Sequence, residues 1–235
     1  MAQTLHSLPE GYQALVIGAR GAIGAALLDQ LQADPRCATA LGLHRQSDPA
    51  LDLLDEAGVA AAAQQLAEQG PFQLIINAAG RLHGPGLMPE KKLGDLRLAS
   101  LQAIFAANTF GPALLLHHFT PLLDRHCGRL AMLSAKVGSI GDNRLGGWYG
   151  YRASKAALNM LIRTAAIELR RSHPGALVAA LHPGTVASAL SAPFRGGELG
   201  RPPATAAAEL LSVLDGLQSP DSGGFFSYTG EALPW

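Results

Sequence analysis

The feature that most constrains the fold is a short apolar run that ends in a glycine-rich turn. Residues 12–17 are mainly apolar, Gly18, Gly21 and Gly24 follow at every third position, and residues 25–33 favour a helix. Between a strand and a helix, such glycines allow a tight turn, close approach of the backbone to a pyrophosphate, and close packing of helix on strand. The start of the helix also offers free N–H groups and the positive end of its dipole. We therefore expect a dinucleotide to bind at this turn.

The rest of the chain alternates apolar runs with helix-forming segments, which indicates a parallel sheet covered by helices on both faces. Strands are expected at residues 38–43, 72–76, 129–133, 176–181 and 224–228, and helices at 56–68, 148–171 and 204–217. Residues 95–124 should be mainly helical, bent or stopped by Pro112 and Pro121. No repeat or linker divides the 235 residues. We expect a single doubly wound Rossmann-type α/β domain over residues 1–235, with about seven strands in its sheet.

The composition limits which binding partners and which cellular compartment are expected. The 18 basic and 18 acidic residues balance and no segment concentrates the basic ones, so neither nucleic acid nor a membrane is an expected partner. Cys37 and Cys127 are too few for a disulfide scaffold and should be packing residues. Adjacent His117 and His118 diverge on a helix, so no metal site is expected. The first ten residues do not resemble a signal peptide, and no apolar stretch approaches about 18 residues. We expect a soluble, cytoplasmic protein.

Tyr151 and Lys155 are the pair of residues that points most directly to chemistry. They lie four positions apart in a segment expected to be helical, so the phenol and the ammonium should share one face. A cation beside a phenol favours the phenolate and lowers its pKa from about 10, toward the range where proton transfer is efficient. The alternative interpretation is an incidental pair on an amphipathic surface helix. Polar residues elsewhere in the chain decide between the two.

Those polar residues follow the predicted strands. In parallel sheets, ligands bind beyond the carboxyl ends of the strands. The residues found at these ends are the glycine turn, His44 and Arg45, Asp52, Asn77 to Gly80, Ser134, and Pro183 to Thr185. Their common position predicts one site along this edge of the sheet.

Taken together, these pieces resemble the short-chain dehydrogenase/reductase family over essentially the whole chain. The motifs that match in order and spacing are the glycine turn, Asn77-Ala78-Ala79-Gly80, Asn108 within an Ala-Asn-Thr-Phe-Gly run, Tyr151 with Lys155, and Pro183-Gly184-Thr185. Residues 138–143, 147–149, 190–194 and 230–235 look like the branch that contains C-factor-like proteins and related carbonyl reductases.

The resemblance implies hydride transfer between a nicotinamide cofactor and a carbonyl or alcohol carbon. Tyr151 would protonate the substrate oxygen, Lys155 would lower the pKa of the tyrosine and bind the nicotinamide ribose, and Asn108 would anchor a water that feeds protons to Lys155. Family members commonly form homodimers or homotetramers through a pair of long helices, which is also expected here. The cofactor-binding positions carried over are Gly18, Arg20, Gly21, Ile23, Gly24, His44, Arg45, Asp52, Leu53, Asn77, Ala78, Ala79, Gly80, Pro183, Gly184, Thr185 and Val186.

Two arginines bear on which cofactor binds. Arg20 lies in the glycine turn, and Arg45 follows about 20 residues beyond it, where NAD-specific enzymes have an acid that binds the ribose 2′-hydroxyl. Basic groups suit a 2′-phosphate, so NADP is expected rather than NAD. The alternatives are that both arginines are solvated surface residues, or that nearby Asp48 supplies the acid.

One family position is missing. Relatives commonly have Ser-Ser-x-x-Gly after this strand, and their second serine donates a hydrogen bond to the substrate oxygen. Here Ser134 is followed by Ala135. Side chains alternate along a strand, so Ser134 should point away from the position of Ala135 unless the backbone has turned. We expect Ser134 to be the site residue, with Ser139 as the alternative donor.

Two functions therefore remain open. The first is an NADP-dependent carbonyl reductase or alcohol dehydrogenase, and the second is a nucleotide-binding signalling or regulatory protein of C-factor type with little or no turnover. Tyr151, Lys155 and Asn108 favour the enzyme, whereas Ala135 weakens it. Residues 82–87, 139–147 and 186–199 should build the substrate pocket, and their glycines and small apolar residues favour a small or apolar carbonyl compound over an anionic one.

Overall fold

The computed structural model describes residues 4–194 and 196–235 and contains one parallel sheet with the strand order β2-β1-β3-β4-β5-β6. The order reverses direction between β1 and β3, which is where a doubly wound fold binds its ligand. The strands are β1 (Tyr12–Ile17), β2 (Cys37–Leu43), β3 (Leu74–Asn77), β4 (Arg129–Leu133), β5 (Leu177–His182) and β6 (Gly224–Ser227). The predicted Rossmann-type α/β class is confirmed.

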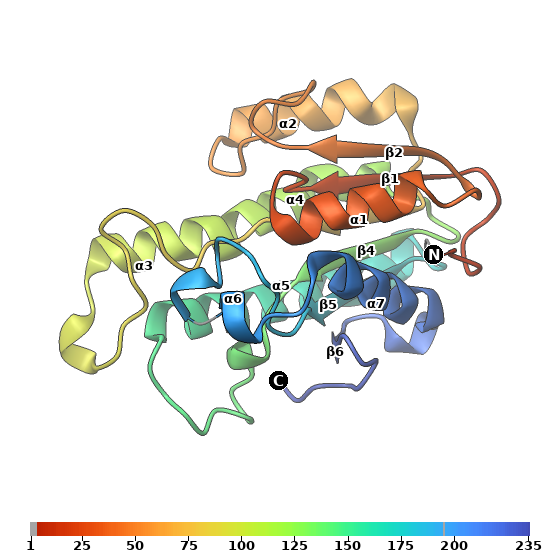
Figure 1. The fold of residues 1–235 in the computed structure, drawn as a ribbon. Coiled ribbons are helices and arrows are strands. Elements are labelled where there is room, and N and C mark those ends of the chain that lie inside the picture. The colour runs from red at the N-terminus through yellow and green to blue at the C-terminus, as the bar shows by residue number, and fades with distance from the viewer. Residues whose placement is uncertain (1–3, 195) are drawn as a thin grey trace.

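Helices cover both faces of the sheet (Figure 1). On one face α1 and α7 pack side by side, and on the other face lie α2, α4 and α5. The α-helices are α1 (Ala22–Gln32), α2 (Glu56–Leu66), α3 (Leu98–Phe105), α4 (Gly111–Phe119), α5 (Tyr149–Ser172), α6 (Gly196–Leu199) and α7 (Pro203–Gly216). Arg195, in the predicted pocket range 186–199, and residues 1–3, in the predicted single domain and the N-terminal segment, lie outside the described residues.

The β1 strand shows why the chain adopts this layering. Its side chains alternate, so that Leu15 and Ile17 enter the core beneath α2, α4 and α5, whereas Ala14 and Val16 enter the core beneath α1 and α7. All four are at most 2% exposed. A strand buried on both faces is apolar, which explains the hydrophobic run from Ala14 to Ile17.

The sheet has six strands in the described part of the chain, and the prediction of about seven was wrong. Between β2 and β3 the only α-helix is α2, and residues 44–55 in front of it form a loop. This loop folds on itself, since the carbonyl of His44 accepts a hydrogen bond from the Leu51 N–H at 2.9 Å. Without a further strand beyond it, β2 forms the edge of the sheet.

The predicted helical stretch 95–124 is divided into short pieces. After α3 the chain makes a π-helical turn, Ala106–Phe110, then α4, then a 3₁₀ turn, Thr120–Leu122. Pro112 lies in the first turn of α4, directly after the π-helical turn, and Pro121 lies in the 3₁₀ turn that ends this stretch.

The same stretch corrects the expectation that no apolar segment is long enough to cross a membrane. By length and composition, the helical stretch Leu98–Leu122 could do so, and 33% of its most apolar window is buried. Leu115 and Phe119 from this stretch pack in the core with α5 and the sheet. A single helix of this kind is weak evidence for a membrane span.

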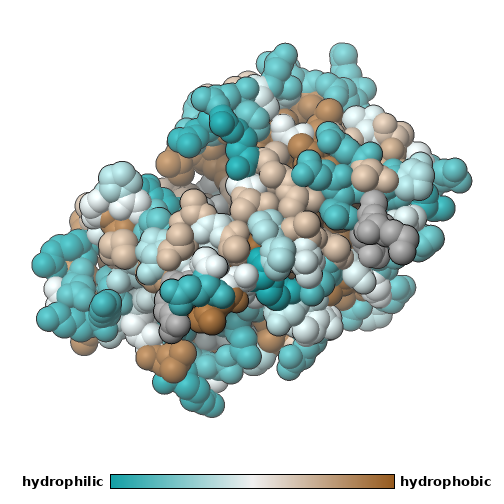
Figure 2. All heavy atoms as spheres, in the orientation of Figure 1, coloured by the Kyte–Doolittle hydropathy of each residue, from teal (hydrophilic) through white to brown (hydrophobic). Residues whose placement is uncertain are grey.

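The surface seen from the side of α1 and α7 mixes hydrophilic and hydrophobic residues, with the most hydrophobic ones scattered (Figure 2). Scattered apolar residues are normal on folded proteins. The two cysteines, Cys37 and Cys127, are free and half-buried.

The glycine turn supplies a test of the fold. A Cβ on Gly24 would lie 2.2 Å from the Gly18 carbonyl oxygen, so Gly24→Ala must push helix and turn apart. We expect the free energy of unfolding to fall by about 1–3 kcal/mol, measured by urea denaturation. Gly94→Ala is the control, because a Cβ there meets nothing within 4 Å. Equal unfolding midpoints for the two variants would contradict this account of the turn.

Candidate active site

Tyr151 and Lys155 lie in the first turns of α5, at the carboxyl end of β4. Lys155 is 3% exposed, and its ammonium donates a hydrogen bond to the Leu133 carbonyl oxygen at 2.9 Å. It lies 5.8 Å from the centre of the Tyr151 ring. The structure therefore brings the phenol and the ammonium together on one face of the helix.

Burial controls the titration of both groups. It raises the pKa of Tyr151 to about 12 and lowers the pKa of Lys155 to about 8, because removal from water disfavours the charged form of each. The pKa of Tyr151 thus shifts in the direction opposite to the sequence-based expectation, because loss of hydration sets it. The phenol thus keeps its proton at neutral pH and is available as an acid.

Asn108 lies in the π-helical turn and is fully buried. Its side-chain oxygen accepts a hydrogen bond from the Arg81 N–H at 2.8 Å, and its amide donates to the Arg81 carbonyl at 2.8 Å and to Ser154 Oγ at 3.1 Å. This side chain therefore fastens the loop after β3 to α5. π-helical turns frequently occur at functional sites. The water-anchoring role implied by the family resemblance stays a prediction.

Gly80 shows how closely these pieces meet. A Cβ at this position would lie 3.4 Å from Asn108 Oδ1 and 3.5 Å from Lys155 Nζ. The last residue of the Asn77 to Gly80 motif thus lies next to two of the predicted catalytic side chains. Motifs that are far apart in the sequence converge on one place.

The glycine turn lies beside the same motif. Gly18 has a φ of +81°, and a Cβ on it would lie 2.7 Å from the Ala79 nitrogen. Asn77 is buried, and its side chain accepts a hydrogen bond from the Ala79 N–H at 3.0 Å. Gly21 is the N-cap of α1 and makes no side-chain capping bond. Backbone donors without Cβ atoms in front of them, at the start of an eleven-residue helix, fit a dinucleotide pyrophosphate.

The predicted 2′-phosphate residues lie along the rim next to β2. The Arg20 guanidinium donates a hydrogen bond to the side chain of Gln46, which joins the glycine turn to the loop after β2. Arg45 is exposed, and His44 Nδ1 accepts a hydrogen bond from the Gln46 N–H at 3.1 Å. Farther along this loop, exposed Asp52 accepts a hydrogen bond from the Leu54 N–H at 3.1 Å. Leu53 lies close to the start of α4: a Cβ added to Gly111 would be 2.7 Å from the Cβ of Leu53.

Residues 183–186 are held by a cation–π pair that the sequence did not reveal. The Arg201 guanidinium lies 3.6 Å from the centre of the Tyr228 ring and also donates to the Pro183 carbonyl and to Glu209. The Thr185 carbonyl accepts a hydrogen bond from the Arg201 N–H at 2.9 Å. This pairing fixes the backbone strip beyond β5. No periodicity or spacing in the sequence links positions 201 and 228.

The structure shows the hydrogen bonds of the two serines considered as donors to the substrate oxygen, Ser134 and Ser139. The Ser134 hydroxyl is buried and donates to Asn159 Oδ1 at 2.6 Å, so in this arrangement its proton faces α5. Ser139 is buried after a 3₁₀ turn, and its hydroxyl accepts a hydrogen bond from the Asp142 N–H at 3.1 Å. Neither hydroxyl is in hydrogen-bond contact with Tyr151 or Lys155 among the described residues. A serine role in catalysis stays a prediction.

Two charged residues that sequence reasoning missed hold the start of α5. The buried carboxylate of Glu90 accepts a hydrogen bond from the Gly150 N–H at 3.0 Å, although the two residues are 60 positions apart. The Arg152 guanidinium donates to three backbone carbonyls, those of Val137, Gly146 and Gly147. Arg152 could have been suspected from its place next to Tyr151, whereas Glu90 carries no local signal.

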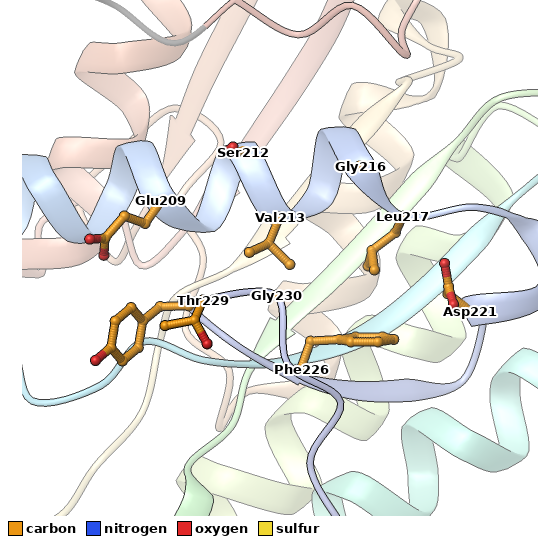
Figure 3. A pocket seen from close by; sticks show the side chains of 10 residues that line it. Glu209, Ser212, Val213, Gly216, Leu217, Asp221, Phe226, Thr229 and Gly230 are labelled. Carbon is orange, nitrogen blue, oxygen red and sulfur yellow. The ribbon is translucent and has the colours of Figure 1, made fainter.

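A cavity of about 480 Å³ lies between α7 and the segment around β6 (Figure 3). Val213 and Leu217 point from α7 toward Phe226 across it. None of the predicted catalytic residues lines this cavity. It is therefore separate from the site at Tyr151.

A comparison with protein families bears on what this arrangement is. A family model described as short chain dehydrogenase matches residues 49–198, a range that contains Asn108, Tyr151 and Lys155. The chain belongs to the short-chain dehydrogenase family. Among curated members, this short-chain dehydrogenase is 34% identical over 188 residues to 1-hydroxy-2-glutathionyl-2-methyl-3-butene dehydrogenase of Rhodococcus sp. (strain AD45), covering 80% of each chain. It is 36% identical over 172 residues to C-signal of Myxococcus xanthus, covering 71% of this chain and 94% of C-signal.

Solved structures agree with the family assignment. The NADPH-bound carbonyl reductase from chicken fatty liver superposes on this short-chain dehydrogenase with a TM-score of 0.80 at 26% identity, covering 97% of this chain and 100% of the reductase. The carbonyl reductase Sniffer of D. melanogaster has a TM-score of 0.81 at 20% identity, covering 96% and 99% of the two chains, and so shares the fold.

The buried ammonium makes the stability of this short-chain dehydrogenase depend on pH. Because the folded-state pKa of Lys155 is lowered to about 8, the cost of its buried charge is present below that pH. The cost is relieved as pH rises toward the unfolded-state value near 10.4. Relative to Lys155→Met, wild type should gain about 1–3 kcal/mol of unfolding free energy between about pH 7.5 and about pH 10. Urea denaturation of both proteins across this range measures the difference, which cancels titrations they share. Parallel stability curves would show that the ammonium is not desolvated.

Proposed function

We propose that this short-chain dehydrogenase is an NADP-dependent reductase of carbonyl compounds, able to oxidise the corresponding alcohols in reverse. The observation that carries the proposal is the convergence of Asn108 and Lys155 at Gly80, with the Lys155 ammonium 5.8 Å from the centre of the Tyr151 ring. A protein that only bound a nucleotide would have no use for a phenol next to a buried ammonium. The similarity to an NADPH-bound carbonyl reductase supports the same conclusion.

In this mechanism the nicotinamide cofactor, when bound, supplies the hydride. The Tyr151 hydroxyl donates its proton to the substrate oxygen as negative charge develops there. Its raised pKa keeps the proton in place until that charge appears. Lys155, held by the Leu133 carbonyl, places its ammonium where it stabilises the phenolate that remains. Since the pKa of Lys155 is lowered to about 8, it can also pass a proton on.

The cofactor would be held by backbone more than by side chains. N–H groups at the start of α1 would bind the pyrophosphate, and the Asn77 to Gly80 loop would border the adenosine side. Arg20 and Arg45 would bind the 2′-phosphate of NADP. Pro183 to Val186, fixed by Arg201, would flank the nicotinamide.

A binding function with little or no turnover is the second candidate. It is favoured by the similarity to C-signal and by Ala135, which leaves the usual substrate-oxygen donor missing. A preorganised donor of this kind is worth about 2.7–4 kcal/mol in enzymes that use one. Measured turnover on any carbonyl compound separates the two candidates.

For the assembly, we propose a cytoplasmic homodimer or homotetramer that binds neither nucleic acid nor membranes. Exposed apolar residues on α5 support a contact between copies, since Met160 is 66% exposed and Ile167 is 53% exposed. The balanced charge of the chain supports the absence of a polyanionic partner.

The proposed acid can be tested directly. Tyr151→Phe should reduce kcat with NADPH by at least about a hundredfold on an aldehyde, ketone and quinone panel, because the proton donor is lost. Its affinity for NADPH should remain nearly unchanged. Tyr149→Phe is the matched control and should keep wild-type turnover. Loss of absorbance of reduced nicotinamide gives the rates, and fluorescence titration gives the affinities. Retained turnover in Tyr151→Phe would remove the tyrosine from the mechanism.

Cofactor preference tests the rim arginines. Wild type should prefer NADPH to NADH, and Arg45→Asp should lower that preference by about tenfold or more, because it replaces attraction for the 2′-phosphate with repulsion. Arg125→Asp makes the same charge change at an exposed position before the amino end of β4, whereas Arg45 follows the carboxyl end of β2, and it should leave the preference unchanged. The measurement is kcat/KM for each cofactor with one good substrate. An unchanged ratio in Arg45→Asp would exclude Arg45 from the cofactor site.

A further inference from the structure

A row of aromatic rings extends from the proposed acid. The ring of Trp148 contacts that of Tyr151 edge-on, with centroids 6.1 Å apart, and contacts Phe194 at 4.9 Å. His83 continues the row at 5.8 Å from Phe194. The rings come from the start of α5, from the segment beyond β5 and from the loop after β3. They join segments that the sequence assigned to the substrate pocket.

The backbone of Trp148 has a conformation that its side chain disfavours. Trp148 has a φ of 52° and a ψ of 42°, and it is the only non-glycine residue with positive φ in the part of the chain that the structure describes. Gly146 and Gly147 before it also have positive φ. A third glycine would satisfy this left-handed turn without a Cβ clash. A large ring retained at a strained position points to a use for the ring itself.

The direction of this ring is set by contacts on both sides. The Trp148 N–H donates to the Glu90 carbonyl at 2.5 Å, and the Glu90 carboxylate binds the N–H of Gly150. Arg152 ties the preceding glycines to the helix through the carbonyls of Gly146 and Gly147. The backbone on either side of Trp148 is therefore fixed, which preorganises the ring beside Tyr151.

Among the residues that the structure describes, no charged side chain belongs to the row itself. The Arg152 guanidinium is occupied by backbone carbonyls, and the ring of His83 makes a hydrogen bond to the Ala189 carbonyl at 3.1 Å. The surface that remains is apolar and made of π-systems. Aromatic groups gain an edge-to-face or offset-stacked contact with such rings, which saturated groups of the same size do not.

We propose that Trp148 and Phe194 form an aromatic wall that selects substrates whose carbonyl carbon carries an aryl group. The proposal rests on the proposed function. A substrate oxygen that accepts the Tyr151 proton brings the group on its carbonyl carbon close to the ring of Trp148, which contacts Tyr151. Trp148 is thus a specificity-determining residue, and its aromatic contacts distinguish flat rings from saturated ones.

The test compares benzaldehyde with cyclohexanecarboxaldehyde, which have the same carbon skeleton, using NADPH. Trp148→Gly fits the left-handed backbone without strain and removes only the ring. It should lower kcat/KM for benzaldehyde about threefold to tenfold more than for the saturated aldehyde. Trp148→Phe should restore most of the difference. Trp235→Phe alters the other tryptophan of the chain and should leave the ratio of the two substrates at its wild-type value.

A binding measurement keeps the inference testable without turnover. In Trp235→Phe, Trp148 is the remaining tryptophan, and its fluorescence can be titrated with benzyl alcohol and with cyclohexylmethanol. The concentration that saturates the signal should be lower for benzyl alcohol than for cyclohexylmethanol, by about threefold or more. Equal affinity for the two alcohols, or an equal loss of kcat/KM for both aldehydes in Trp148→Gly, overturns the aromatic wall. Absence of turnover on every carbonyl compound, with the binding preference intact, instead overturns the proposed function alone.

Discussion

The site depends on placing one ammonium group inside the protein. Lys155 reaches the end of β4 because its neighbours leave room for it: a Cβ on Gly138 would lie 2.7 Å from the Cβ of Lys155, and Gly80 approaches the ammonium from the other side. A buried cation requires an acceptor, which is the Leu133 carbonyl. The glycines and the strand end are thus conditions for burying the charge, and that burial gives Lys155 and Tyr151 their shifted pKa values.

A second set of contacts transmits this arrangement to the surrounding loops. Asn108 joins the loop at Arg81 to Ser154, and the Thr109 hydroxyl donates to the Ser154 carbonyl at 2.9 Å. Both residues belong to the π-helical turn, which widens the helix at the point where it meets α5. Loop, turn and catalytic helix are therefore one hydrogen-bonded unit, and a change in any of them should be felt at Tyr151.

Local pattern predicted the layers of this protein but not the contacts between distant segments. The β1 run, the glycine turn and the pair Tyr151 and Lys155 were recognisable because periodicity and spacing express them directly. The six strands lie in the six segments that the apolar runs indicated, and the expected total of about seven had no seventh segment behind it. Local sequence also does not reveal how far a side chain is removed from water. For this reason the expected lowering of the pKa of Tyr151 was wrong, and its pKa is raised instead. Glu90 was missed, and the contact of Phe194 with Trp148 was not foreseen, because their partners at positions 150 and 148 lie beyond the reach of any local rule.

Since β2 is the edge strand, the rim that carries Arg20 and Arg45 faces bulk water, whereas Lys155 is buried and Tyr151 is partly buried. Dissolved ions screen exposed charges over about 8 Å at physiological ionic strength and affect buried ones far less. Choice of nucleotide and chemistry would therefore respond differently to salt. Raising the ionic strength should weaken the preference for the 2′-phosphate of NADP and leave proton transfer at Tyr151 nearly unchanged. Cofactor recognition in this protein would thus be sensitive to salt, whereas catalysis would not.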